Sequence, residues 1–350
     1  MKKSTSRIQV NYISVLSGIS CFAVVMLHSN GAFWAFSKER YWITSNLIEC
    51  LMYFAVPIFF MISGSTLIDY RDKYSTKEYF KKRITKTVVP FIAWSFIGLL
   101  YQFIVGGIGF KGGISGIKSI IGALLNTDVI GVYWFFIPLF SMYLCIPFIS
   151  LIPKDNRKKI FQYCVCLCAV LNLLIPFMCN VFGFDYSNRV TLPICSGYVF
   201  YIMTGYLLNT SELKLIHRIS IYILGIIGLL MHFAGTYYLS MDANQIIQTY
   251  KGYNNVPAVL YSIAVFVLFK QIVSRLSEDN IVCKTANAFG KYTFSIYLIH
   301  WFVLQILTKI FELNTLSIVY RVGMPFIVIP ICILIAFILK KIPILCRIVP

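Results

Sequence analysis

The chain has 350 residues, of which 59% are hydrophobic and only 13% are charged, about half the charged share of an ordinary soluble domain. A soluble fold of this length could not bury so much apolar surface, which excludes the soluble enzyme classes. The net charge of +18 would suggest a nucleic-acid partner for a soluble protein, but in a membrane protein it reports topology, and we expect no nucleic-acid binding.

Long apolar runs recur along the whole chain. Many are apolar on all sides and close to the roughly 20 residues that span a bilayer. We therefore predict an all-α polytopic membrane protein with about ten transmembrane helices, the sixth and eighth being the shortest. The predicted spans are residues 10–33, 45–69, 88–107, 129–152, 160–183, 191–208, 219–239, 256–273, 292–311 and 320–342.

The distribution of basic residues orients these helices. With the N-terminus inside, the cytoplasmic segments contain 23 of the 31 Lys and Arg residues and the outer segments contain 8. Because basic loops are retained in the cytoplasm, both termini are predicted to be cytoplasmic.

No linker, low-complexity tract or internal repeat is visible, so we predict one membrane domain over residues 1–350. The outer segment 107–128 is long enough for a re-entrant or interfacial helix, and its start overlaps the flexible sequence GGIGFKGGISG. The 11 Cys residues have no metal-ligand spacing, and we expect no metal.

Ionisable residues inside a membrane are candidates for function, because burying them is costly. The predicted helices contain His28, Glu49, His232 and His300. His28 lies roughly 27 Å along the first helix, close to the outer face, and Glu49 lies at a similar depth on the next helix. A Glu49–His28 pair would suit a catalytic base, whereas two unpaired polar residues near the headgroups are the alternative.

His300 lies in KYTFSIYLIHW, with Tyr292 and Ser295 on the same side at helical spacing. These residues are expected to form a polar wall of a cavity. Equally, His300 could hydrogen-bond to a neighbouring helix.

The cytoplasmic sequence YSTKEYFKKRITKTVVP is strongly basic. It could be an ordinary topogenic loop beside anionic lipid or a phosphate site. Arg83 and Lys86, with Lys82 beside them, would then bind a phosphorylated cofactor such as a coenzyme A. Ser63 and Gly64, low in the second helix, are small enough to let another backbone, or a thin ligand chain, approach closely.

Six segments in chain order resemble the acyltransferase-3 family of bacterial membrane O-acyltransferases. They are YISVLSGISCFAVVMLH, AVPIFFMISGSTL, YFKKRITKTVVPF, YWFFIPLFSMYLCIP, YIMTGYLL and FSIYLIHW, and the resemblance covers nearly the whole chain.

The resemblance implies transfer of a short acyl group, usually acetyl, from a cytoplasmic acyl-CoA to a hydroxyl of a cell-surface glycan or glycolipid. It implies a location in the bacterial inner membrane. His28 matches the essential histidine of the family, as base or as transient acyl carrier, and Glu49 is expected to orient it. Arg83 and Lys86 match the basic loop, and Ser63 and Gly64 the path of the donor arm. Trp134, in the YWFF segment, is expected to line the acceptor cavity with His300, Tyr292 and Ser295.

One position departs from the family. Ser17 stands eleven residues before His28, where the family commonly has Arg or Lys. A cation must then come from another helix, or the donor binds weakly, or the protein is a non-catalytic glycan transporter or assembly partner on the same scaffold. An ion-coupled carrier is less favoured, because Glu49 is the only carboxylate well inside a predicted span.

Overall fold

Helices form the regular structure of the described part of the chain, and no strand occurs in it. The computed structural model describes residues 2–105, 113–187, 192–277 and 279–350, without the side chains of residues 2–11, 113–115, 117 and 125. The first seven residues of the glycine-rich sequence at 106–116 lie outside these ranges. The N-terminal half contains α1 Lys2–Ser29, η1 Gly31–Trp34, α2 Arg40–Met52, α3 Ala55–Leu67, η2 Tyr70–Asp72, α4 Thr76–Arg83, η3 Ile84–Val88, α5 Val89–Val105, α6 Gly113–Leu125, η4 Gly131–Phe135, α7 Phe136–Ile149, α8 Lys154–Cys168 and η5 Ala169–Leu174.

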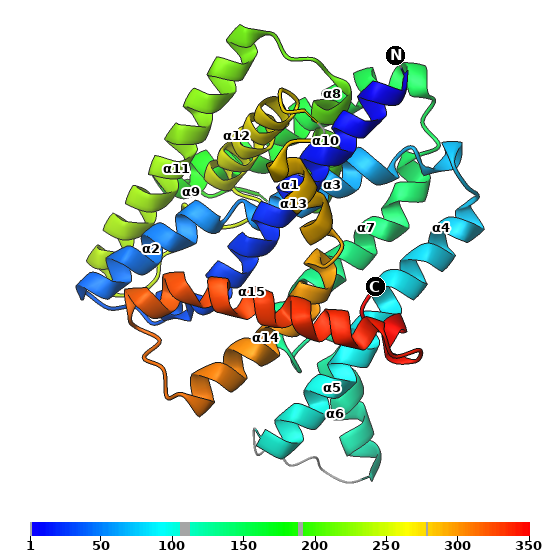
Figure 1. Ribbon diagram of the computed structural model, residues 1–350. Helices are drawn as coiled ribbons and strands as arrows, with labels where there is room; N and C mark the ends of the chain where they lie inside the picture. The colour runs from blue at the N-terminus through cyan, green and yellow to red at the C-terminus, as the bar shows by residue number, and fades with distance from the viewer. Residues whose placement is uncertain (1, 106–112, 188–191, 278) are drawn as a thin grey trace.

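The remaining elements complete a helical bundle. They are α9 Ile175–Phe182, η6 Pro193–Cys195, α10 Tyr198–Thr210, α11 Leu215–Ala243, α12 Val256–Val273, α13 Ile281–Gly290, α14 Thr293–Ile310, α15 Ile318–Lys340 and η7 Leu345–Arg347. In Figure 1, α1 runs through the middle of the bundle, where it contacts α3, α12, α14 and α15. The central position of α1 surrounds its side chains with the rest of the protein.

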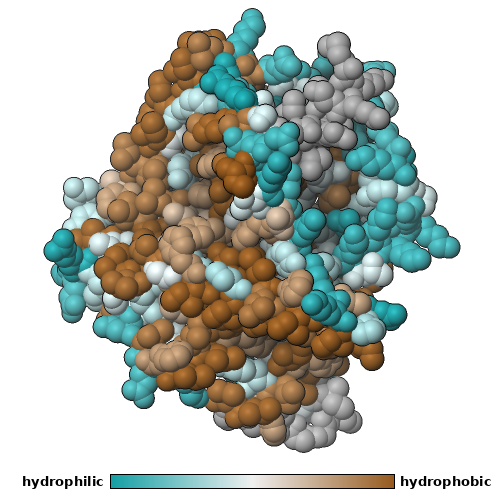
Figure 2. All heavy atoms as spheres, viewed as in Figure 1, coloured by the Kyte–Doolittle hydropathy of each residue, from teal (hydrophilic) through white to brown (hydrophobic). Residues whose placement is uncertain are grey.

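The membrane prediction is confirmed. Nine helical segments of the described chain are long and apolar enough to cross a bilayer, and Figure 2 shows hydrophobic side chains over much of the flank formed by α11 and α15. The sixth predicted span is different: α10 has 13 residues, about 20 Å, against a hydrocarbon core of about 30 Å. It lies buried beside α3. Among the described residues, α10 is the predicted span that is not long enough to be counted as a crossing, and the cytoplasmic position of both termini stays a prediction. The outer segment 107–128, expected to contain a re-entrant or interfacial helix, does contain the helix α6, and its place relative to the membrane stays a prediction.

Two prolines, Pro57 and Pro90, interrupt the regular hydrogen bonding of the helices in the N-terminal half. Pro57 has no N–H for the carbonyl of Tyr53, and the second predicted span divides there into α2 and α3, with Tyr53 and Phe54 between them. Pro90 has the same effect on Lys86, and the preceding turn widens into a π-helix in which the Val89 N–H bonds to the carbonyl of Ile84. Each break changes the direction in which the adjacent side chains point.

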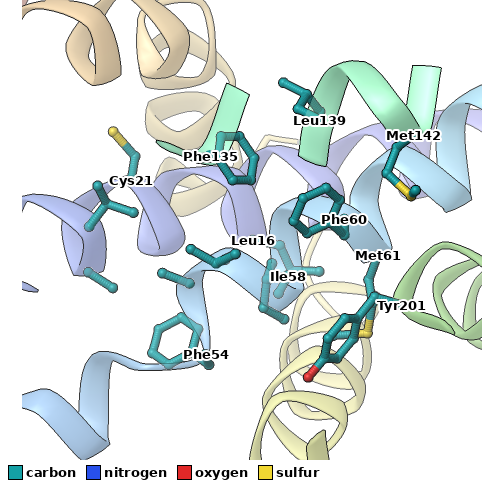
Figure 3. Packing of buried hydrophobic residues seen from close by; sticks show 14 of the residues in the cluster. Leu16, Cys21, Phe54, Ile58, Phe60, Met61, Phe135, Leu139, Met142 and Tyr201 are labelled. Atoms are coloured by element: carbon teal, nitrogen blue, oxygen red, sulfur yellow. The ribbon is translucent and has the colours of Figure 1, made fainter. Parts of the chain in front are cut away.

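Helices α3 and α10 approach each other through two glycines. A Cβ atom on Gly64 would lie 1.9 Å from the carbonyl oxygen of Ile202, and one on Gly205 would lie 2.1 Å from that of Met61. Small residues of this kind let transmembrane backbones touch. Figure 3 shows the surrounding core, in which Phe60 of α3 lies against Phe135 of η4.

We expect Gly205→Ala to destabilise the protein by at least the roughly 1–3 kcal/mol that overpacking costs, because backbone cannot move aside as a flexible side chain can. The matched control is Gly323→Ala in α15, where a Cβ meets nothing within 4 Å. The control should be neutral or stabilising by up to about 1 kcal/mol, the helix preference of Ala over Gly. Thermal unfolding in detergent measures both, and equal effects would contradict the close crossing.

Candidate active site

His28 lies in the last turn of α1, which is fixed by a buried arginine. Ser29 donates a hydrogen bond of 2.9 Å to the carbonyl of Arg321 in α15. The Arg321 guanidinium, 1% exposed, donates to Ser45 Oγ at 2.6 Å and to Thr44 Oγ1 at 2.8 Å in α2. These bonds connect α1, α2 and α15 at the end of the bundle predicted to face outward.

A cavity of about 390 Å³ opens beside His28. Its walls come from α1, η1, the α2–α3 break, η4, α14 and the segment between α11 and α12. The polar and aromatic side chains on these walls are His28, Trp34, Glu49, Tyr53, Trp134, Tyr253 and Tyr297. The cavity therefore combines a possible base with aromatic surfaces.

A second histidine lies beside the His28 ring. The His28 and His300 ring centroids are 5.1 Å apart. His300 Nδ1 lies 2.7 Å from the carbonyl oxygen of Tyr297 and 3.1 Å from that of Ile296. Because carbonyl oxygens only accept hydrogen bonds, Nδ1 carries the hydrogen of neutral His300 and Nε2 is an acceptor. Nε2 is buried and has no partner among the described residues.

The expected Glu49–His28 hydrogen bond is wrong. Glu49 lines the cavity, but its carboxylate accepts a 2.6 Å hydrogen bond from Lys251 Nζ, and no hydrogen bond between described residues involves the His28 imidazole. The Lys251 side chain is 0% exposed and that of Glu49 is 5% exposed. A buried carboxylate needs a compensating cation. For Glu49 that cation is Lys251, from the segment between α11 and α12, and not a protonated His28.

Aromatic rings surround this ion pair and continue along the cavity wall. Lys251 Nζ lies 3.9 Å from the centroid of Tyr53, within cation–π range. Tyr253 stacks on Tyr53 with centroids 4.2 Å apart and on Trp134 with centroids 5.5 Å apart. Trp134, expected from the sequence in this cavity, therefore belongs to a continuous three-ring stack.

Two other expected wall residues lie elsewhere. Tyr292 lies under the Lys340 ammonium, 4.7 Å from its ring centroid, and the Ser295 hydroxyl donates to the carbonyl of Pro350 at 3.2 Å. Both face the C-terminal segment instead of the His28 cavity, so this part of the prediction is wrong. The C-terminal segment folds back onto α14, which no local pattern indicates. His300 itself contacts His28, and Tyr297, three residues earlier, lines the cavity.

The basic segment presents its cations in different directions. The Arg83 guanidinium lies over the rings of Tyr79 and Tyr143 at 5.8 and 5.4 Å, and Lys86 lines a separate pocket. Arg83 does not line the pocket that Lys86 lines, so the structure does not bring the two expected phosphate ligands into one pocket. Lys82 pairs with Glu78 at 2.8 Å, at the surface.

The donor path expected beside Gly64 is also wrong. The α10 backbone fills the space in front of Gly64, as the α3–α10 crossing shows. Ser63 is partly buried, and its hydroxyl donates to the Phe59 carbonyl within the same helix at 2.9 Å. A role for Ser63 in donor binding stays a prediction.

Ser17 donates a hydrogen bond to Thr293 Oγ1 at 3.3 Å. Lys340 of α15 contacts the residues that precede Thr293: its ammonium lies over the ring of Tyr292 and donates to the Lys291 carbonyl at 3.1 Å. The first turn of α14 thus brings a lysine near the position that lacks one in α1.

Lys251 and Arg321 were not predicted as site residues. Both belong to the 8 basic residues of the predicted outer segments. The retention of basic loops in the cytoplasm does not account for basic residues on the outer side. Arg321 also lies inside a predicted span, which is itself a signal of function. Lys251 lies in a loop, where exposed lysines are common, and only its burial reveals its role.

The chain was compared with known proteins. The family model described as an acyltransferase domain, of the acyltransferase-3 family, matches residues 10–339. No curated protein and no solved structure matches the chain. The family match covers nearly every helix described above, including those that carry His28, Glu49 and His300. This multi-pass membrane protein therefore belongs to the acyltransferase-3 family of acyltransferases.

Proposed function

We propose that the protein transfers a short acyl group, acetyl in the first instance, from cytoplasmic acyl-CoA to a hydroxyl of a cell-surface glycan or glycolipid in the bacterial inner membrane. The observation that carries the proposal is the position of His28. Its imidazole has no hydrogen bond within the described chain, lines an aromatic cavity and contacts His300. A free imidazole beside an enclosed space is the arrangement a general base requires.

The proposed reaction is a single acyl transfer. The acceptor hydroxyl oxygen attacks the thioester carbonyl carbon while His28 takes the hydroxyl proton. The C–S bond breaks, and the proton passes to the departing thiolate, giving an ester and free CoA thiol. His300 Nε2, an acceptor without a partner in the described chain, can hold the His28 ring or the acceptor hydroxyl through a hydrogen bond.

The aromatic stack supports a sugar as acceptor. Tyr53, Tyr253 and Trp134 line the cavity as one stack, and Trp134, at the end of that stack, has an outer ring face of the kind that packs against the apolar C–H face of a pyranose. The Glu49–Lys251 pair beside them has no net charge, which suits a neutral polyhydroxyl ligand.

Deletion and restoration of the gene test this function in the cell. We expect cells without the gene to lose O-acyl groups from an envelope glycan, as measured by NMR of the purified glycan, and to regain them with the wild-type gene. Purified protein in liposomes should release CoA thiol from acetyl-CoA only when that glycan is present. Unchanged acylation of every envelope glycan would contradict the proposal.

A further inference from the structure

A second pocket, of about 500 Å³, lies between the π-helix η3 and the C-terminal segment. Lys86 and Arg347 line it, together with Thr85, Val89, Cys346 and Pro350. Arg347 lies beyond residue 339, where the family match ends. The pocket therefore joins the basic segment to a part of the chain outside the family domain.

The C-terminal segment is held firmly enough to place Arg347. Trp94 Nε1 of α5 donates to the Ile348 carbonyl at 2.9 Å. Ser295 of α14 bonds to the carbonyl of Pro350, and Val349 between these two anchors is completely buried. Residues on either side of Val349 are thus fixed against two transmembrane helices.

The two cations have no anionic partner within the described chain. The carboxylates of the neighbouring segment are already paired: Asp69 with Arg157, Asp72 with Lys154 and Glu78 with Lys82. Lys86 and Arg347, both exposed, therefore line one pocket without an ion pair to a side-chain carboxylate of the described chain, an arrangement that attracts an anion. Arg347 offers the planar fork that suits phosphate, and Lys86 adds a point charge.

We propose that Lys86 and Arg347 form a phosphate-binding site at the cytoplasmic end of α5. The choice of acyl-CoA as the ligand that brings the phosphate rests on the proposed function. Val89, Cys346 and Pro350 give the pocket an apolar floor, which suits a phosphate attached to a larger, partly apolar molecule. An anionic lipid headgroup carries the same chemistry, so the experiment separates the two sources.

The test uses the full chain in phosphatidylcholine nanodiscs, with Arg347→Gln compared with Lys341→Gln. Lys341 lies in the same C-terminal region, is exposed and does not line the pocket. We expect Arg347→Gln to weaken acetyl-CoA binding and raise its KM by about tenfold or more, the loss of one charge-assisted hydrogen bond. The kcat at saturating donor should be retained. S-acetylpantetheine, which has no phosphate, should be used equally by wild type and variant.

A second arm replaces part of the phosphatidylcholine with phosphatidylglycerol. If the phosphate comes from lipid, wild-type protein gains thermal stability from phosphatidylglycerol and Arg347→Gln does not, while acetyl-CoA binding is equal in both. Equal behaviour of wild type and variant in both arms would overturn the site, and transfer by the wild type would then leave the proposed function intact. Conversely, a phosphate effect at Arg347 in a protein that transfers no acyl group would uphold the site and refute the function.

Discussion

Replacing His28 with alanine is expected to reduce acyl transfer by a factor of roughly 10²–10⁴, the usual contribution of a positioned general base. The imidazole lines the cavity and contacts His300, and the Glu49 carboxylate on the same cavity wall is already paired with Lys251. Release of CoA thiol by equal amounts of folded protein in liposomes measures the loss, which should fall on kcat more than on the KM for acyl-CoA.

The control is His217→Ala, the same substitution at an exposed position of α11. We expect this variant to transfer at the wild-type rate. Wild-type activity in the His28 variant would remove His28 from the chemistry. Incubation with radiolabelled acetyl-CoA in the absence of acceptor separates a base from an acyl carrier: a base leaves the protein unlabelled, whereas a carrier accumulates acetyl on His28.

Lys251→Met is expected to destabilise the protein by about 3–5 kcal/mol, because it leaves the Glu49 carboxylate buried without its cation. Both side chains are almost completely inaccessible, so water cannot replace the lost partner. Thermal unfolding in detergent measures the effect. Lys38→Met, at an exposed position in the outer loop after η1, is the matched control and should change stability little.

A double-mutant cycle with Glu49→Gln tests the pairing itself. We expect the double variant to lose clearly less stability than the sum of the two single variants, because removing both charges leaves no unpaired one. Additive losses would show that the two residues act independently and would contradict the ion pair.

The sequence predicts the helices of this protein better than it predicts the partners of their polar side chains. Apolar runs indicate the spans directly, because a helix that crosses the bilayer core must be apolar over about 20 residues. Basic loops indicate their orientation, because such loops are retained in the cytoplasm. The break at Tyr53 and Phe54 follows from Pro57, which has no N–H for the Tyr53 carbonyl. The break lies where that carbonyl lacks its hydrogen bond. The close packing of α10 against Gly64 is not encoded in hydropathy.

Within the site, depth is predictable and pairing is not. His28 and Glu49 do line the same cavity, as their positions on consecutive helices predict. Lys251, however, is 202 residues from Glu49 along the chain, and nothing local distinguishes it from an exposed loop lysine. Lys86 lies in the π-helical turn η3, and the periodicity of the sequence does not predict such a turn.

The wall opposite His28 has a further consequence. Lys251 and Tyr253 belong to the irregular segment between α11 and α12, and they are held by side-chain contacts with Glu49, Tyr53 and Trp134. The histidines, by contrast, sit on helices at the centre of the bundle. Under the proposed function, the chemistry and part of the acceptor recognition would therefore lie in different parts of the chain. Substitutions between α11 and α12 would then change the preferred acceptor while the helices that carry the two histidines stay unchanged.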